Sequence, residues 1–275
     1  MLIRLFSVLM LLSVMLFSCK NAYQKALKTN DTKTKLEMAD YYFNKKDFAR
    51  ANTLYEQIED ALSGTALAKK VLYRSAQCSF GLKQYGLAGF QYKTFFENYP
   101  TAGDTSEEAL YMTAYCQYLE SQEPELDQTD TYKAIETIRI FFSVYPESRY
   151  VPECNNMIDK LRAKLSEKSY RTAKLYFNMG EYKSAIIALR NTVNDFPEIA
   201  QKEEIDFLIV KSNYLLAINS IAEKQVERFR NTLEAYDDFM EEHTETTKYS
   251  AELNFYRDKS LQALKKLENK NNLNQ

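Results

Sequence analysis

The 275-residue chain is poor in the residues that break helices, since it contains only 6 glycines and 5 prolines. An all-β fold needs many tight turns, and such turns draw heavily on these two residues. Tyrosine and phenylalanine, by contrast, are abundant, at 21 and 16. The composition therefore favours long helices joined by short connections, and the fold class that we predict is all-α.

The sequence also lacks the common signatures of catalysis. It has one histidine, His243, and no Gly-rich phosphate loop, HExxH, GxSxG or CxxC motif. One histidine cannot supply a multi-histidine metal cluster. Carboxylate pairs such as Asp237–Asp238 and Glu241–Glu242 lie in amphipathic stretches, where a solvated helix face is the simplest interpretation. We predict no enzyme activity, no metal and no cofactor.

The chain has no large excess of charge of either sign, since it contains 36 basic and 38 acidic residues. A nucleic-acid-binding protein usually has a clear basic excess. Nucleic acid is therefore not among the partners that we expect.

The first 18 residues have the pattern of a secretory signal. Arg4 is followed by a nearly continuous apolar run from Leu5 to Phe17, which is 13 residues long. A helix needs about 20 apolar residues to cross a bilayer, so this run is too short to span one. It fits the apolar core of a signal peptide. We predict that residues 1–18 are a cleaved signal peptide.

The end of this signal, Leu16-Phe17-Ser18-Cys19, resembles a lipobox, although Phe17 replaces the usual small residue. The resemblance implies lipidation of Cys19, with residues 19–32 as a lipidated tether. Two or more acyl chains hold a protein stably at a membrane. Neither Lys20 nor Asn21 is the aspartate that retains many lipoproteins at the inner membrane. We expect the periplasmic face of the outer membrane; the alternative is an ordinary signal with a chance cysteine.

Three cysteines remain in the mature chain. Cys78 and Cys116 lie among apolar residues with helical spacing, and Cys154 makes the number odd. A free cysteine commonly behaves as a small buried hydrophobe. We favour core packing over a disulfide for Cys78 and Cys116.

An internal repeat sets the architecture. Three segments end in Tyr-Pro or Phe-Pro, and an alanine stands twelve residues before each proline: Ala88 before Pro100, Ala134 before Pro146 and Ala185 before Pro197. An earlier copy keeps Ala51 and has Ser63 in place of proline. Other small residues, Ala39, Ala76 and Ala173, occupy the preceding helical stretches. This pattern resembles the paired helices of tetratricopeptide repeats.

The repeats predict a tetratricopeptide-type α-solenoid of about five helix pairs over residues 33–265, followed by a polar tail at 266–275. Small residues let the two helices of a pair approach closely, and each proline ends the second helix. Residues 120–130 are expected to be an acidic insertion, and residues 152–165 to belong to a lengthened helix. Gly180 is expected to end a helix in a left-handed turn.

A family resemblance covers nearly the whole mature chain and is strongest in its middle. The stretch Tyr145-Pro-Glu-Ser-Arg-Tyr150 is followed by a long helical segment and then by Ala173-Lys-Leu-Tyr-Phe and Gly180-Glu-Tyr-Lys-Ser-Ala185. This resembles the BamD family of lipoproteins, which belong to the outer-membrane β-barrel assembly machinery. The resemblance implies two protein partners, nascent outer-membrane β-barrel proteins and the barrel-forming subunit of the outer membrane. It also implies that residues 170–249 dock on that subunit.

The first helix of each tetratricopeptide pair lines the concave face. Two positions seven residues apart in four successive pairs share one stripe of their helix, and they give the candidate peptide-binding residues Leu36, Phe43, Tyr73, Phe80, Tyr111, Tyr118, Tyr170 and Phe177. We predict an aromatic trough for an extended, aromatic-rich peptide. Packing of these rings between helices is the alternative. Lys33, Lys70 and Lys174 lie near the stripe and could attract a carboxylate.

Two other functions fit the same features. One is a tetratricopeptide adaptor lipoprotein that recruits cell-envelope enzymes. The other is a substrate-capturing lipoprotein of a nutrient-uptake system, which should have a glycan or small-ligand pocket.

Overall fold

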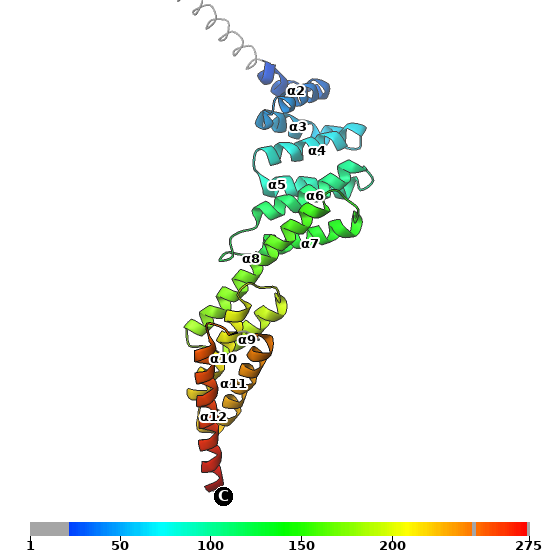
Figure 1. Cartoon of the computed structure of the whole chain (residues 1–275). Helices are drawn as coiled ribbons and strands as arrows, with labels where there is room; N and C mark the ends of the chain where they lie inside the picture. Colours follow the sequence, from blue (N-terminus) through cyan, green and yellow to red (C-terminus); the bar gives the residue numbers. More distant parts are fainter. Residues whose placement is uncertain (1–21, 244–245, 274–275) are drawn as a thin grey trace, which may run out of the picture. The chain divides into compact units, whose positions relative to one another are not determined.

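The computed structural model describes residues 22–243 and 246–273, and within these residues every regular element is a helix (Figure 1). The predicted signal peptide and Cys19 lie outside the described residues. After a short helical segment at 22–28, the elements are α2 (Thr32–Asn44), α3 (Phe48–Leu62), α4 (Ala66–Gly81), α5 (Tyr85–Asn98), α6 (Asp104–Glu120), α7 (Thr129–Val144), α8 (Val151–Asn178), α9 (Tyr182–Asp195), α10 (Lys202–Ile218), α11 (Ala222–Glu242) and α12 (Ser250–Leu273).

Helices α2 to α11 form five consecutive helix pairs, and each element follows the predicted repeat. The prediction of an all-α solenoid of paired helices is confirmed. None of the helices in the described part of the chain is both long and apolar enough to span a bilayer.

The described residues fall into two compact units. Unit 1 comprises residues 22–122 and 127–158, and unit 2 comprises residues 123–126, 159–243 and 246–273. Helix α8 contributes its first residues to unit 1 and its remainder to unit 2.

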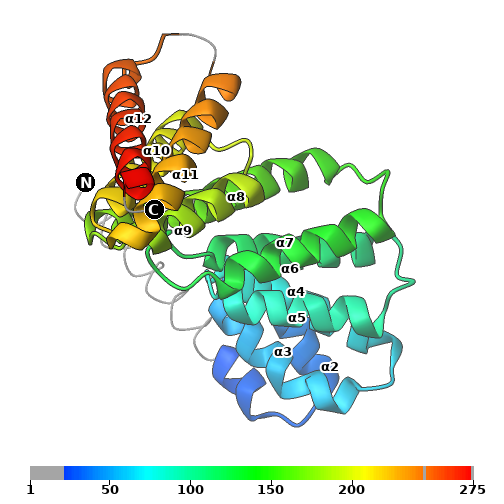
Figure 2. The same ribbon diagram turned by 90° about the horizontal axis from the view of Figure 1, so that it is seen from below.

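Unit 1 is a stack in which each helix from α2 to α7 packs on the next one in the chain (Figures 1 and 2). The alanines of the repeat explain this close packing. Ala39, Ala51, Ala76, Ala88 and Ala134 have no exposed surface. Because a methyl group is the only side chain at these contacts, the helix backbones approach closely.

The residue four positions after each second-helix alanine completes the core. These residues, one helical turn further along the same face, are fully or almost fully buried at Tyr55, Tyr92, Ile138 and Leu189. The alanine repeat therefore marks the buried face of the second helix in each of the first four pairs, namely α3, α5, α7 and α9.

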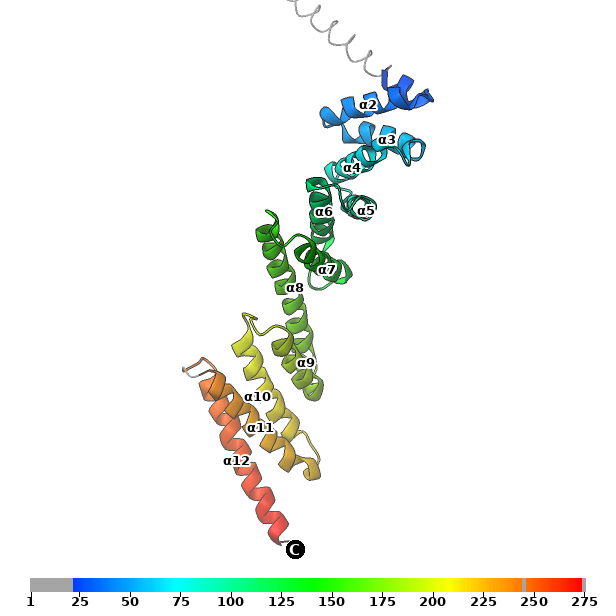
Figure 3. The ribbon, with the colours of Figure 1, turned by 90° about the vertical axis from the view of Figure 1, so that its right-hand side faces the viewer.

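Unit 2 has its own core, built by the second half of α8 together with α9, α10, α11 and α12. Ala173, Ala185 and Leu189 meet Ile205 and Phe239 there. Helix α12 packs against both α10 and α11 (Figure 3). It lies outside the five pairs and covers apolar surface of the last one.

The helix ends follow the predicted signals. Helices α5, α7 and α9 stop before Tyr99, Tyr145 and Phe196, whose φ angles of −132°, −130° and −135° lie outside the helical range. Each of these residues precedes a proline, which disfavours helical backbone in its neighbour. Gly180 has a φ of +78°, the left-handed conformation expected after the end of α8.

The insertion and the long helix are also confirmed. Residues 121–128 separate α6 from α7, and α8 is 28 residues long with Pro152 in its first turn. The Lys168 ammonium donates hydrogen bonds to the carbonyl oxygens of Pro124 and Leu126, at 2.9 and 2.8 Å. This lysine fastens the insertion to α8 within unit 2.

Two predicted boundaries differ from the structure. Residues 22–28 of the expected tether are helical, and Ala26 is buried beside the ring of Tyr23, which meets Tyr42 edge to face. The expected polar tail at 266–275 is instead the end of α12, which continues to Leu273. No proline or glycine follows Lys265, so nothing in the sequence stops the helix there.

Candidate functional site

The eight candidate peptide-binding residues do not share one environment. Tyr111 and Tyr170 are buried, with 9% and 6% of their surface exposed. The other six are half-buried: Leu36, Phe43, Tyr73, Phe80, Tyr118 and Phe177. Tyr170 and Phe177 belong to unit 2 and the rest to unit 1.

Tyr111 and Tyr170 are core residues, so their prediction as trough-lining side chains is wrong. The Tyr111 ring stacks on Tyr150 with ring centroids 4.1 Å apart, and its hydroxyl donates to Glu153 at 2.7 Å. Burial, assisted by this bond to Glu153, raises the pKa of Tyr111. The Tyr170 hydroxyl accepts a hydrogen bond from Lys174 at 2.8 Å. The helical stripe carries both rings toward neighbouring helices instead of solvent.

Three of the half-buried candidates also pack chiefly against the core. Leu36 borders the cluster around Ala39, and Tyr73 lies 5.0 Å from the Phe95 ring and 5.7 Å from the Tyr92 ring. Phe177 lies 5.9 Å from the Tyr182 ring in unit 2. These contacts favour the alternative that the side chains pack between helices.

The three remaining half-buried candidates, Phe43, Phe80 and Tyr118, lie in unit 1, and two of them contact a residue that the seven-residue spacing missed. Tyr115 on α6 lies 6.0 Å from Phe80 on α4 and 6.2 Å from Tyr118 one turn further along α6. It is half-buried and stacks on Tyr111. We define the aromatic stripe of unit 1 as Phe43, Phe80, Tyr115 and Tyr118.

Next to Tyr111, the loop after α7 encloses a cavity of about 420 Å³. Tyr145, Ser148 and Tyr150 line it from the loop, and Asp104 and Glu107 line it from the start of α6. The Ser148 hydroxyl donates to Glu107 at 2.5 Å, which ties the loop to α6. The conspicuous Tyr-Pro-Glu-Ser-Arg-Tyr sequence thus builds the junction between α6 and α8 within unit 1.

The lysines proposed to attract a carboxylate are largely neutralised. Lys70 pairs with Asp40 at 2.5 Å, and Lys174 pairs with Glu204 at 2.7 Å. The hydrogen bond to Glu204 raises the pKa of Lys174. Lys33 stays exposed at the beginning of α2.

A different basic residue, Arg74, lies beside the aromatic stripe and could bind an anion. The guanidinium of Arg74 lies 4.0 Å from the centre of the Phe43 ring, and its polar contact is a weak one, 3.4 Å from the amide oxygen of Gln77. Arg74 forms no ion pair with any residue that the structure describes. Arg74 follows the candidate residue Tyr73 on α4, and nothing in the sequence marked it as a binding residue.

The cysteines and the histidine have structural surroundings. Cys78 and Cys116 are free and buried, which confirms the prediction of core packing for these two, and Cys154 is free and buried as well. His243 lies with its Nε2 atom 2.8 Å from Asp206 and its ring on Phe239. Burial raises the pKa of Asp206. Within residues 22–243 and 246–273, no three His, Cys, Asp or Glu side chains gather as a metal site would require.

Comparison with known protein families identifies the family of the chain. The family model YfiO, described as an outer membrane lipoprotein, matches residues 29–229, which is most of the chain. The chain belongs to the YfiO family of outer membrane lipoproteins. The matched residues run from before α2 into α11, so they cover most of unit 1 and a part of unit 2.

A relative supports the same family. A protein of Aquifex aeolicus, named as an outer membrane protein assembly factor, BamD, is 28% identical over 226 residues, covering 82% of this YfiO-family chain and 67% of its own length. The predicted resemblance to the BamD family is thereby confirmed.

Solved tetratricopeptide structures are more distant from this YfiO-family chain. The TPR domain of P58(IPK) is 14% identical with a TM-score of 0.40, covering 86% of this chain and 66% of its own. The TPR2AB domain of yeast Sti1 in its pHSP90 complex is 12% identical with a TM-score of 0.37, covering 83% and 98%. Scores this low carry no argument about function.

Proposed function

We propose that this chain is a non-catalytic scaffold of the outer-membrane β-barrel protein assembly complex. Unit 1 receives a terminal peptide of a nascent barrel protein, and residues 170–249 dock on the barrel-forming subunit. Membership of the YfiO family and the likeness to an assembly factor named BamD support the setting. The observation that carries the peptide-binding part is the aromatic stripe beside the unpaired Arg74.

The stripe fits an aromatic side chain. Aromatic residues are favoured anchors at protein interfaces because they bury a large, rigid area at little entropic cost. Phe80, Tyr115 and Tyr118 offer ring surface at neighbouring positions, with centroid distances of 6.0 and 6.2 Å. Such spacing matches the 4.5–7 Å range in which aromatic rings attract one another.

Arg74 gives the stripe a charge preference. A guanidinium can hold a carboxylate with two parallel hydrogen bonds, and Arg74 has no carboxylate partner among the described residues. A peptide that ends in an aromatic residue carries its ring and its terminal carboxylate on the same residue. We propose that Arg74 takes the carboxylate while the stripe takes the ring.

The test uses a labelled peptide that ends in phenylalanine and the same peptide with an amidated end. Fluorescence anisotropy with the full chain in detergent should give tighter binding of the acid than of the amide, by about tenfold, which corresponds to about 1.4 kcal/mol. Arg74→Gln should remove this difference. The combined change Tyr115→Ala and Tyr118→Ala should weaken both peptides.

The matched control is Tyr132→Ala. Tyr132 is 62% exposed on α7 and lies outside the stripe, so its removal should leave the affinity unchanged. Equal binding of acid and amide by the parent chain would refute the carboxylate role, and full affinity in a folded Tyr115/Tyr118 variant would refute the stripe.

An affinity pull-down from detergent-solubilised envelope tests the complex itself. Recovery of the barrel-forming subunit supports the assembly role. Recovery of a cell-envelope hydrolase or of an uptake transporter in its place would favour the adaptor or the nutrient-uptake alternative.

A further inference from the structure

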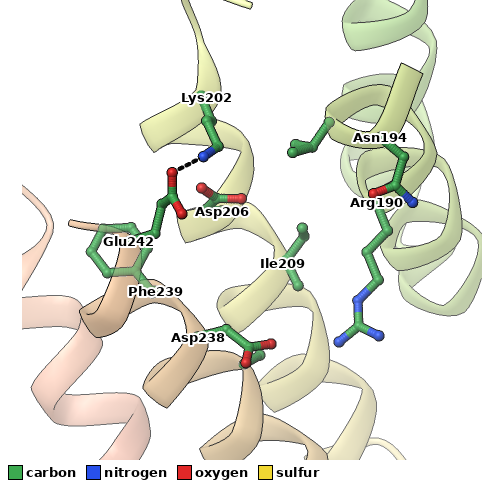
Figure 4. A pocket seen from close by; sticks show the side chains of 10 residues that line it. Arg190, Asn194, Lys202, Asp206, Ile209, Asp238, Phe239 and Glu242 are labelled. Carbon is green, nitrogen blue, oxygen red and sulfur yellow. Dashed lines mark hydrogen bonds and ion pairs between the residues drawn. The ribbon is translucent and has the colours of Figure 1, made fainter. Parts of the chain in front are cut away.

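Unit 2 contains a groove along three helices, and lining residues such as Ile209 and Phe239 also belong to the core of the unit. Two cavities, of about 410 and 350 Å³, are each lined by α9, α10 and α11, and Arg190 on α9 borders both. Figure 4 shows the first cavity, with α10 between the other two helices and side chains from all three pointing into the space. The two cavities are neighbours that meet at Arg190, and we treat them together as one groove.

The floor of the groove follows a single face of α10. Its lining residues recur every three or four positions, at Lys202, Asp206, Ile209, Asn213 and Leu216. This spacing keeps all of them on one stripe of the helix. From Lys202 to Leu216 the stripe extends about 21 Å at 1.5 Å per residue, which is about four helical turns.

Apolar side chains line both cavities of this groove. Ile187 on α9 is 54% exposed although it lines the cavity, and Ile209 and Leu216 contribute from the floor. An isoleucine that lines a cavity and still exposes half of its surface is available to an apolar ligand.

The two ends of the groove differ in charge. At one end Lys183, Lys224 and Arg228 outnumber Glu227 and Glu234. At the other end Glu242 pairs with Lys202 and Asp206 pairs with His243, so Asp238 is the carboxylate left without an ion pair to a described residue. Lys183, Lys224 and Asp238 are exposed and form no ion pair with a described residue. A ligand with the complementary distribution would be held in one direction.

We propose that this groove binds an amphipathic α-helix of a partner protein, with acidic first turns over the Lys183 and Lys224 end and basic last turns over the Asp238 end. This charge order is the one that stabilises an isolated helix, because anions are favoured at its N-terminus and cations at its C-terminus. The bound helix therefore runs antiparallel to α10.

A helix suits the groove better than an extended strand. The walls are helices whose backbone groups are already bonded within each helix, so they offer no sheet edge for an added strand. A helical ligand brings its own backbone bonds and needs only side-chain contacts. An apolar stripe with a spacing of three or four residues matches the floor of α10.

This inference refines the docking proposed for residues 170–249 and rests on it only for the identity of the partner. A synthetic helix tests the groove directly, so a negative result here leaves the aromatic stripe and the complex untouched. Conversely, failure of the complex to form would not remove binding of the helix.

The probe is a hydrocarbon-stapled peptide of about 15 residues, about 22 Å long as a helix. It carries one leucine stripe, three glutamates in its first turns and three lysines in its last turns. A second peptide has the glutamates and lysines exchanged and keeps the same composition and staple. The full chain in detergent should bind the first peptide at least about tenfold more tightly than the second.

Reversing the groove's charges should reverse this preference. The variant combines Lys183→Glu and Lys224→Glu at one end with Asp238→Lys and Glu242→Lys at the other, four exposed positions whose net charge change is zero. It should prefer the exchanged peptide. Equal affinities in the parent chain, or an unchanged preference in a folded variant, would overturn the proposal.

A second variant covers the case in which the charge-reversed chain does not fold. Ile187→Glu should weaken both peptides at least about fivefold because it places a charge against their apolar stripe. Leu175→Glu is the matched control, since Leu175 is 57% exposed on α8 and does not line the groove. Equal loss of affinity in both variants, or in neither, would also overturn the proposal.

Discussion

At the scale of single residues, burial changes the chemistry of the three described cysteines. Desolvation raises the pKa of Cys78 and Cys116 to about 12 and that of Cys154 to about 11. Only the thiolate reacts with an alkylating agent. We therefore expect no labelling by iodoacetamide at pH 8 in the folded chain and full labelling in urea, measured by mass spectrometry of the peptides containing these cysteines.

The same shift has a consequence for stability. An unfolded thiol titrates near pH 8.5, whereas the folded chain holds its thiol protons to much higher pH. The contribution of these groups to stability is therefore complete below about pH 8.5 and is lost as the pH rises toward 12. Rapid labelling of Cys78 or Cys116 in the folded chain at pH 8 would contradict both statements.

The Tyr111 hydroxyl offers a second test at this scale. It is buried and donates to Glu153 at 2.7 Å. Tyr111→Phe removes a hydrogen bond to a charged acceptor while keeping the stacked ring, so it should lower the free energy of unfolding by about 1–2 kcal/mol. Urea unfolding followed by circular dichroism measures the change.

Tyr118→Phe is the control for Tyr111→Phe. The Tyr118 ring is half-buried, so water reaches its surroundings, and removing its hydroxyl should change the stability by less than about 0.5 kcal/mol. A loss as large as that of Tyr111→Phe would show that the bond to Glu153 is not the cause.

At the scale of elements, two glycines of α5 should respond in opposite directions to the same substitution. A Cβ at Gly86 would meet nothing within 4 Å, whereas a Cβ at Gly89 would lie 3.1 Å from the Cβ of Cys116 on α6. Alanine stabilises a helix over glycine by about 0.5–1 kcal/mol. Overpacking a close contact costs about 1–3 kcal/mol.

Gly86→Ala should therefore raise the midpoint of thermal unfolding. Gly89→Ala should lower the midpoint, because it reduces the free energy of unfolding by about 1 kcal/mol net. The two variants share one helix and one chemical change, so each is the control for the other. A more stable Gly89→Ala chain would mean that α5 and α6 can separate slightly without loss.

Local signals in the sequence were enough to place these elements. The alanine twelve residues before each proline marked both the buried face and the end of a second helix, and Gly180 marked the turn after α8. The helices that escaped prediction carry no such signal. Residues 22–28 lie outside the repeat, and their helix packs on Tyr42 through Tyr23. The end of α12 is polar, and no residue there stops the helix.

The candidate site was less predictable because it depends on contacts between helices. A spacing of seven residues identified Phe80 and Tyr118, but it could not tell that Tyr111 turns toward Tyr150. Tyr115 joins the stripe only through a contact with Phe80 on another helix. The availability of Arg74, and the neutralisation of Lys70 by Asp40 thirty residues earlier, are likewise tertiary facts.

At the scale of the whole molecule, the remaining question is what holds the chain at a membrane. The net charge is −2, so the sequence provides no basic excess for attraction to anionic lipids. None of the described helices can span a bilayer. The proposed acyl chains on Cys19 would supply about 0.8 kcal/mol for each buried methylene, and two or more chains make release very slow.

Cys19→Ser should therefore move the protein from the outer-membrane fraction to the soluble periplasmic fraction after cell breakage. Cys78→Ser, a change at a buried core thiol, is the control and should stay with the membrane until detergent is added. A wash with about 1 M salt, which shortens electrostatic screening to about 3 Å, separates lipid anchoring from surface attraction. If the Cys19→Ser protein still sediments with the membrane after that wash, another contact retains the chain and the anchor proposal is refuted.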